Sequence, residues 1–140
     1  MADHDVAELP LWVQISHAAG RIEQQLEDAL AGSGLSLSKL AVLRQLTQSD
    51  EPLPLTQLAR RLSCVKSNVT QLVDRLEAEG LVVREDDPDD RRSVRARITD
   101  SGRTRCEVGC DALHAREREI FAAINEAEGR MLGDVLKRLG

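Results

Sequence analysis

Apolar residues recur at helical spacing in the first third of the chain. Between residues 11 and 30 they fall every three or four positions, which predicts an amphipathic helix. Gly32 and Gly34 follow directly and are typical of a helix end. A second helix is predicted after Ser36, a suitable N-cap, with an inward face of Leu37, Leu40, Leu43 and Leu46. Residues 49–54 contain two prolines, so a loop is expected there.

Two short amphipathic segments come next, joined by a few residues. Each repeats apolar side chains at positions i, i+3, i+4 and i+7, the spacing of a helix that buries one face. The first set is Leu55, Leu58, Ala59 and Leu62, and the second is Val69, Leu72, Val73 and Leu76. Gly80 is expected to end the second helix, at residues 66–79. Two short helices joined in this way indicate a helix-turn-helix.

Strand-like alternation replaces the helical period after Gly80. Residues 81–84 and 93–99 have the composition of two strands, and the acidic stretch 85–90 between them predicts a β-hairpin with a long tip. A long helix is expected at about residues 100–125, N-capped within 99–102. Its inward side chains would be Cys106, Cys110, Leu113, Ile120 or Phe121, and Ile124. A final helix carries Met131, Leu132, Val135, Leu136 and Leu139.

This order of elements predicts a mainly α-helical fold, an α+β winged helix with added terminal helices. We expect residues 1–34 to form an N-terminal dimerisation helix, residues 35–100 the winged helix-turn-helix lobe, and residues 101–140 the C-terminal dimerisation helices. The apolar stripes of the terminal helices are longer than such a lobe can cover. Uncovered stripes of this size normally mark an interface, here between two copies of the chain.

Length and composition narrow the class of protein. A chain of 140 residues fits one domain, or a small domain with an oligomerisation arm. Apolar runs stay well below the roughly 18 residues of a membrane span, and residues 1–8 lack the features of a signal peptide, so a cytoplasmic protein without a membrane partner is expected. Trp12 and Phe121 are the only aromatic residues, which argues against stacking modules for single-stranded RNA.

The charge is distributed unevenly along the chain. The net charge of −5 would argue against nucleic acid. However, residues 55–76 hold four cations against one anion, and residues 91–105 hold six cations against one anion. The acidic stretch 77–90 lies between these two basic blocks. Because a phosphate backbone responds to local potential, the acidic total does not exclude DNA.

The polar face of the predicted helix at 66–79 has the composition of a DNA-reading surface. It carries short hydrogen-bonding side chains and cations, which suit base edges and phosphates in a major groove, whereas a solvated face more often carries Glu and Lys pairs. The candidates on this helix are Lys66, Ser67, Asn68, Thr70, Gln71 and Arg75. Thr56, at the start of the preceding helix, is a candidate for a phosphate contact.

Arginines at the predicted hairpin form a second candidate surface. Arg91 and Arg92 lie at the tip, and Arg95 and Arg97 lie on the returning strand. An arginine at such a tip can enter a narrow minor groove, where the negative potential is enhanced. We therefore add Arg91, Arg92 and Arg95 to the candidate DNA contacts. Asp90 or, equally, Asp89 can pair with an arginine and hold the tip.

Together these residues resemble the MarR family of winged helix-turn-helix transcriptional regulators. The matching stretches are Leu55-Thr56-Gln57-Leu58-Ala59, residues 67–82, Pro88-Asp89-Asp90-Arg91-Arg92 and Ile98-Thr99-Asp100-Ser101-Gly102. The resemblance implies that the helix at 66–79 reads the major groove. It also implies that Arg92, the arginine of the Asp-x-Arg motif, reaches the minor groove.

The resemblance further implies a homodimeric regulator of transcription, bound to double-stranded DNA and released by a small effector. A two-fold dimer places two reading helices one DNA turn apart, so a pseudo-palindromic operator is expected. For a small anionic or aromatic effector, the first helix offers Trp12, His17 and Arg21. The alternative reading is that Trp12 is a packing anchor and that His17 lies at the dimer edge.

The three cysteines allow a different form of regulation. Cys106, Cys110 and His114 are spaced four apart on one helix face, which fits a metal site or thiol sensor, or two small buried residues beside an edge histidine. Cys64 lies just before the N-terminus of the helix at 66–79 and close to Lys66. The positive end of a helix and a neighbouring cation both lower the pKa of a thiol and favour the thiolate. A redox-sensing repressor that uses Cys64 or the Cys106/Cys110 pair is therefore an alternative hypothesis.

A third hypothesis is a helical dimer that acts through protein–protein interaction and binds no operator. The polar face at 66–79 and the intact Asp90-Arg91-Arg92 tip argue against it. An enzyme is not expected, since the sequence shows no nucleophile–base constellation and no glycine-rich phosphate loop. No cofactor and no metal are predicted.

Overall fold

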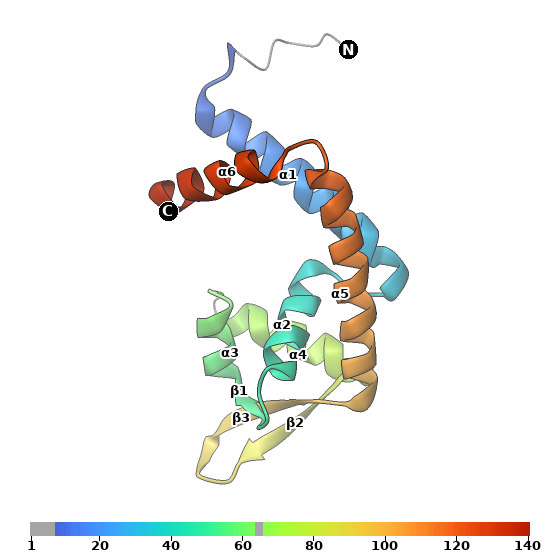
Figure 1. Cartoon of the computed structure of the whole chain (residues 1–140). Helices are drawn as coiled ribbons and strands as arrows, with labels where there is room; N and C mark the ends of the chain where they lie inside the picture. The colour runs from blue at the N-terminus through green and yellow to red at the C-terminus, as the bar shows by residue number, and fades with distance from the viewer. Residues whose placement is uncertain (1–7, 64–65) are drawn as a thin grey trace. The chain divides into compact units, whose positions relative to one another are not determined.

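The computed structural model describes residues 8–63 and 66–140, with the backbone alone for Lys66 and Ser67. It confirms the predicted mainly α-helical winged-helix fold (Figure 1). Its elements, in chain order, are α1 (Leu11–Leu30), a 3₁₀ turn (Ala31–Ser33), α2 (Leu37–Thr47), β1 (Leu53–Pro54), α3 (Leu55–Arg61), α4 (Lys66–Ala78), β2 (Val82–Asp87), β3 (Asp90–Ile98), α5 (Asp100–Phe121) and α6 (Glu126–Leu139).

The chain divides into two compact units. One comprises Leu30–Ala112, and we call it the winged lobe. It contains α2, α3, α4, the three strands and the first part of α5. The other consists of the residues up to Ala29 together with Leu113–Gly140, and we call it the terminal unit. It contains nearly all of α1, the end of α5 and all of α6.

The hydrophobic core belongs to the winged lobe. Within the described residues, every buried apolar side chain lies between Leu30 and Cys106. Helix α2 supplies Leu40, Leu43 and Leu46, as its sequence pattern predicts, and Ser36 caps it by accepting a hydrogen bond from the Lys39 amide at 3.2 Å. Helix α2 also buries Val42, while Leu37 is only half-buried. The helix is therefore covered on more than the one predicted face.

The sheet is small and antiparallel, with strand order β1-β3-β2. Strand β1 lies within the stretch 49–54, where the sequence predicted only a loop. Leu53 is buried and pairs with Ala96, while Pro54 pairs with Arg95. Proline lacks a backbone donor and is tolerated at a sheet edge, which is the position that β1 occupies.

The hairpin is longer, and its turn tighter, than the sequence predicted. Strand β2 runs to Asp87 and β3 begins at Asp90, so the acidic residues extend the strands and only Pro88 and Asp89 remain as a loop. The register shifts near the end, from Asp86 opposite Val94 to Asp87 opposite Asp90. Residues 91–93 therefore have no partner in the ladder and form a bulge in β3.

The terminal unit has a different character. Helix α5 ends at Phe121 and not near residue 125, because Asn125 begins α6 as its N-cap in a reciprocal capping box with Glu128. Helix α6 has no buried residue, and Leu30 is the only one in α1. None of the helices in the described part of the chain combines the length and apolar character needed to cross a membrane.

Candidate nucleic-acid interface

Helix α4 is anchored in the lobe by its apolar side. Val69, Val73 and Leu76 are fully buried, and Leu72 is half-buried. The helix packs against α2, α3 and β2, which fixes both its position and the direction of its polar face. The apolar pattern that predicted a helix-turn-helix is thus confirmed in three dimensions.

The end of α4 is tied to the beginning of α5. Gly80 has a φ of 75°, a left-handed conformation that glycine adopts readily, and it turns the chain after α4. Thr99 donates from its amide to the Leu81 carbonyl at 3.0 Å and from its hydroxyl to the Gly80 carbonyl at 2.8 Å. A Cβ at Gly102 would lie 2.1 Å from the Leu81 oxygen, so only glycine permits this close approach.

The described candidates on α4 differ in exposure. Asn68, Gln71 and Arg75 are exposed, and Thr70 is half-buried. The side chains of Lys66 and Ser67 lie outside the described part of the structure. Asn68, Gln71 and Arg75 are therefore accessible to a partner while the opposite side of the helix holds the core.

Carboxylates shape the backbone of the hairpin tip. Asp87 accepts a hydrogen bond from the Asp89 amide at 2.9 Å, and Asp90 accepts one from the Arg92 amide at 3.0 Å. The acidic residues of the tip thus satisfy backbone donors in the turn, a common role of aspartate. Asp90 does hold the tip next to an arginine, although through the peptide N–H of Arg92. Arg91 and Arg92 are exposed in the bulge that this turn creates.

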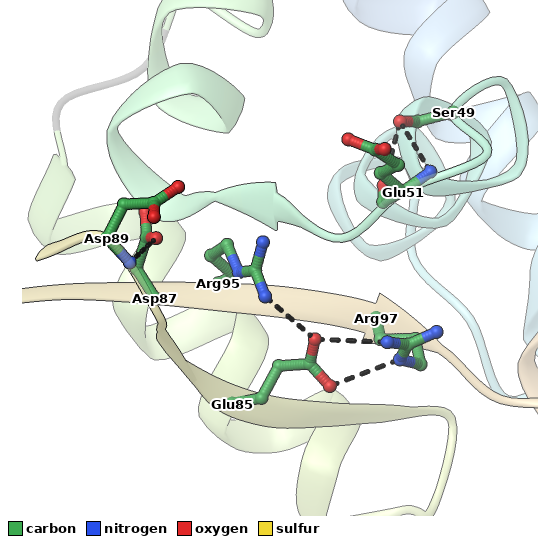
Figure 2. A network of polar contacts seen from close by, with 7 residues as sticks. All are labelled: Ser49, Glu51, Glu85, Asp87, Asp89, Arg95 and Arg97. Atoms are coloured by element: carbon green, nitrogen blue, oxygen red, sulfur yellow. Dashed lines mark hydrogen bonds and ion pairs between the residues drawn. The ribbon is translucent and has the colours of Figure 1, made fainter.

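The arginines of the returning strand are engaged on the outer face of the hairpin (Figure 2). Glu85 accepts hydrogen bonds from Arg97 at 3.1 Å and from Arg95 at 3.3 Å. The hydrogen bond from Arg97 lowers the pKa of the Glu85 carboxyl. Arg95, a predicted DNA contact, thus has its charge balanced locally by Glu85. Nearby, Ser49 and Glu51 form their own turn through a bond from the Ser49 hydroxyl to the Glu51 carbonyl at 2.8 Å.

The fold brings several predicted residues to one place. Thr56, Thr70 and Arg92 line a hollow of about 410 Å³ bounded by α3, α4 and the hairpin. Thr56 is exposed in the first turn of α3. Residues from three sequence segments therefore converge on one surface of the winged lobe.

Sequence reasoning missed one group at this surface. Arg84 on β2 forms an ion pair with Asp74 on α4 and donates to the Thr70 carbonyl at 3.2 Å. Its backbone amide donates to Glu77 at 2.8 Å. A usable signal was present, because Arg84 lies two residues after the buried Val82 in a strand and therefore faces the same, inward side. A charged side chain at such a position needs a partner.

The effector candidates lie elsewhere in the fold. Trp12, His17 and Arg21 are all on α1 in the terminal unit, and all are exposed. Trp12 is 71% exposed, which makes it one of the most exposed large apolar residues. His17 and Arg21 are one helical turn apart and share a face.

The described cysteines fit the structural reading better than the sensing one. Cys106 is buried, and burial raises the pKa of its thiol to about 11, with Cys110 adding to the rise. A thiol with this pKa is protonated at neutral pH and is a poor nucleophile. Cys110 is half-buried, and His114 is exposed near Glu117. Residues 8–63 and 66–140 contain no metal-binding group of three or more His, Cys, Asp or Glu side chains. Cys64 lies outside the described residues.

These features define a class of protein. A helix-turn-helix with a polar, exposed second helix and a hairpin bearing arginines at its tip is the architecture of winged-helix DNA-binding proteins.

Comparisons with known proteins agree with this assignment. The MarR family profile matches residues 35–94. The repressor YetL of Bacillus subtilis is 28% identical, with 99% of this chain and 86% of YetL aligned. The regulator MhqR of the same organism is 31% identical, with 94% and 90% aligned. The crystal structure of Sco3205, a MarR family regulator from Streptomyces coelicolor in complex with DNA, is 26% identical, covers 92% of this chain and 82% of its own, and superposes with a TM-score of 0.84.

The chain belongs to the MarR family and is a DNA-binding regulator of transcription. This membership confirms the predicted fold class and the prediction that the protein is not an enzyme.

Proposed function

We propose that the protein is a homodimeric repressor that binds a pseudo-palindromic operator in the cytoplasm and releases it when a small effector binds. The observation that carries the DNA-binding part is that Thr56 of α3, Thr70 of α4 and Arg92 of the hairpin tip line one hollow of the winged lobe. In this proposal Asn68, Gln71 and Arg75 contact the major groove, together with Lys66, Ser67 and Thr70, and Arg92 enters the minor groove with Arg91 beside it. Thr56 and Arg95 contact phosphates. The relatives named as repressors support the direction of the effect.

The apolar surface of the terminal unit supports the dimer. Large side chains on its helices are exposed instead of buried: Leu11, Trp12, Ile15, Phe121, Met131, Leu132, Leu136 and Leu139. Exposed apolar patches of this kind mark interfaces in soluble proteins. In the proposal, residues 1–34 and 101–140 supply the dimer contacts and residues 35–100 the DNA-binding lobe. A symmetric partner would bury the same surface on both chains.

The test is a fluorescence anisotropy titration of the full chain on its own upstream DNA and on a scrambled duplex, at several salt concentrations. We expect selective binding that weakens as salt rises and saturates at one dimer per site. Arg92→Ala should weaken binding about tenfold, within the range for a specific contact. Arg118→Ala, an exposed arginine of the terminal unit, is the matched control and should change little. If the wild type and both variants bind the two duplexes equally and weakly, the result would instead favour a protein-interaction role.

The effector part of the proposal has a separate test. His17 and Arg21 offer neighbouring hydrogen-bond donors to a carboxylate, and Trp12 offers an apolar surface. Benzoate, the simplest aromatic carboxylate, serves as the first probe of this chemistry. Release of labelled operator by benzoate in the wild type, and its loss in His17→Ala and Arg21→Ala, would support the site. Release that both variants retain would place the effector elsewhere.

A further inference from the structure

Arg84 connects the hairpin to the proposed reading helix through three separate contacts. Its guanidinium pairs with Asp74 and donates to the Thr70 carbonyl at 3.2 Å, and its backbone amide donates to the Glu77 carboxylate at 2.8 Å. Thr70, Asp74 and Glu77 are spaced four and three residues apart, so they form one stripe along α4. A single residue of β2 is thus bonded to nearly two turns of the helix.

The position of Arg84 in the hairpin explains why it can do this. Arg84 pairs with Ala96 across the ladder, and Val82 on the same face is fully buried. Its side chain is 30% exposed and lines the 410 Å³ hollow together with Thr70 and Arg92. Arg84 therefore borders the hollow that also contains the arginine at the tip.

The charges on α4 make this arrangement unexpected for a surface that meets phosphate. Asp74 and Glu77 are carboxylates on the proposed reading helix, and by charge alone each would repel DNA. A partly exposed ion pair contributes little to folding, so stabilisation alone accounts poorly for them. Holding two contact surfaces at a fixed separation accounts for them better, because a preorganised site avoids the cost of ordering on binding.

We propose that Arg84, Asp74 and Glu77 are positioning residues that fix the wing relative to α4, so that both engage DNA at once. This inference rests on the proposed DNA-binding function. It assigns the three residues no contact with DNA. Their effect is on Arg92, whose contribution to binding depends on where the hairpin is held.

The experiment is a double-mutant cycle on the full chain, with a duplex selected from genomic DNA by the wild type. Asp74→Asn removes a negative charge and is nearly isosteric, yet it should weaken operator binding about tenfold because it releases Arg84. Asp86→Asn removes the same charge from exposed Asp86 on the same hairpin and should leave affinity unchanged or slightly higher. Arg92→Ala should cost about tenfold in the wild type and less than about threefold in the Asp74→Asn background.

Two further variants keep the test independent of folding. Glu77→Ala should reproduce the loss because it removes the acceptor for the Arg84 amide. Arg84→Lys should retain part of the affinity because it keeps the charge without the guanidinium fork. All titrations are made well below the melting temperature of each variant, measured by circular dichroism. Binding by Asp74→Asn as tight as the wild type, or an equal Arg92→Ala penalty in both backgrounds, overturns the inference alone. Failure to select any duplex, or an Arg92→Ala change without effect in the wild type, overturns the proposed function and this inference with it.

Discussion

The winged lobe and the terminal unit treat their apolar side chains in opposite ways. In the lobe, leucines and valines from α2, α3, α4 and the sheet are buried against one another. In the terminal unit, Trp12 is 71% exposed and Met131 69% exposed, and no residue of α6 is buried. Both units carry strong amphipathic patterns, so the difference does not lie in local sequence. In the proposed homodimer, the difference lies in whether the elements that cover each apolar face belong to the same chain.

The contrast has a thermodynamic meaning. A core closed within one chain folds with a stability that is independent of protein concentration. A surface covered by a second copy gains stability only through association, which depends on concentration. The two units should therefore respond differently to equivalent substitutions.

The largest expected effect is on the lobe core. Leu58→Ala empties a fully buried site on α3 and should lower the free energy of unfolding by about 2–5 kcal/mol. Urea unfolding followed by circular dichroism at two protein concentrations measures this loss, which should be the same at both. Leu132→Ala on α6 is the matched variant, and its effect on the free energy of unfolding should depend on protein concentration. Identical behaviour of the two variants would contradict the contrast.

Glycine-to-alanine substitutions should have opposite signs in the two units. At Gly102 a new Cβ would clash with the Leu81 carbonyl at 2.1 Å, and we expect a loss of about 1–3 kcal/mol, typical of overpacking. At Gly133 in α6 no atom other than those of the neighbouring helix backbone lies within 4 Å of the new Cβ, so alanine should stabilise the helix by about 0.5–1 kcal/mol. Thermal melts compare the two. A destabilising Gly133→Ala would mark that position as covered by the partner subunit.

Loss of the capping box of α6 should lower the free energy of unfolding by an intermediate amount. Asn125→Ala removes the acceptor for the Glu128 amide and should cost about 1 kcal/mol. The measurement is chemical denaturation, with Asn125→Asp as the control that keeps the cap. If alanine and aspartate behave alike, the cap does not limit the stability of this unit.

The smallest effect is expected from a surface ion pair of the lobe. Lys39 on α2 pairs with Glu79 after α4 at 2.6 Å, and Lys39→Met should cost only about 0.2–1 kcal/mol. The difference from the wild type should diminish in 1 M salt, because salt screens exposed charges. A cost that persists in salt would show that Lys39 acts through packing.

The sequence predicted the elements whose determinants are local. The helices follow from apolar periodicity, the start of α2 follows from Ser36, and the end of α4 from Gly80. Strand β1 escaped prediction because a two-residue strand beside prolines has no alternation to read. The tip was predicted too long because the aspartates, which look like loop residues, instead satisfy the amides of Asp89 and Arg92.

The candidate site was predictable to a similar extent. The polar face of α4 and the arginines of the tip follow from composition, and the fold gathers Thr56, Thr70 and Arg92 around one hollow. The pairing of Arg84 with Asp74, and of Glu85 with Arg95 and Arg97, depends on which residues face each other across strands and helices. Spacing along the chain does not specify such contacts, because they are set by register and packing.

The junction between α4 and α5 couples the end of the first helix rigidly to the start of the second. The Leu81 carbonyl accepts a hydrogen bond from the Thr99 amide and packs closely against Gly102. The Thr99 hydroxyl also donates to the Gly80 carbonyl. A reorientation of the first turn of α5 would therefore also reorient the last turn of α4. In the proposed DNA complex, a small rotation of this first turn of α5 would therefore change the angle at which α4 meets a groove.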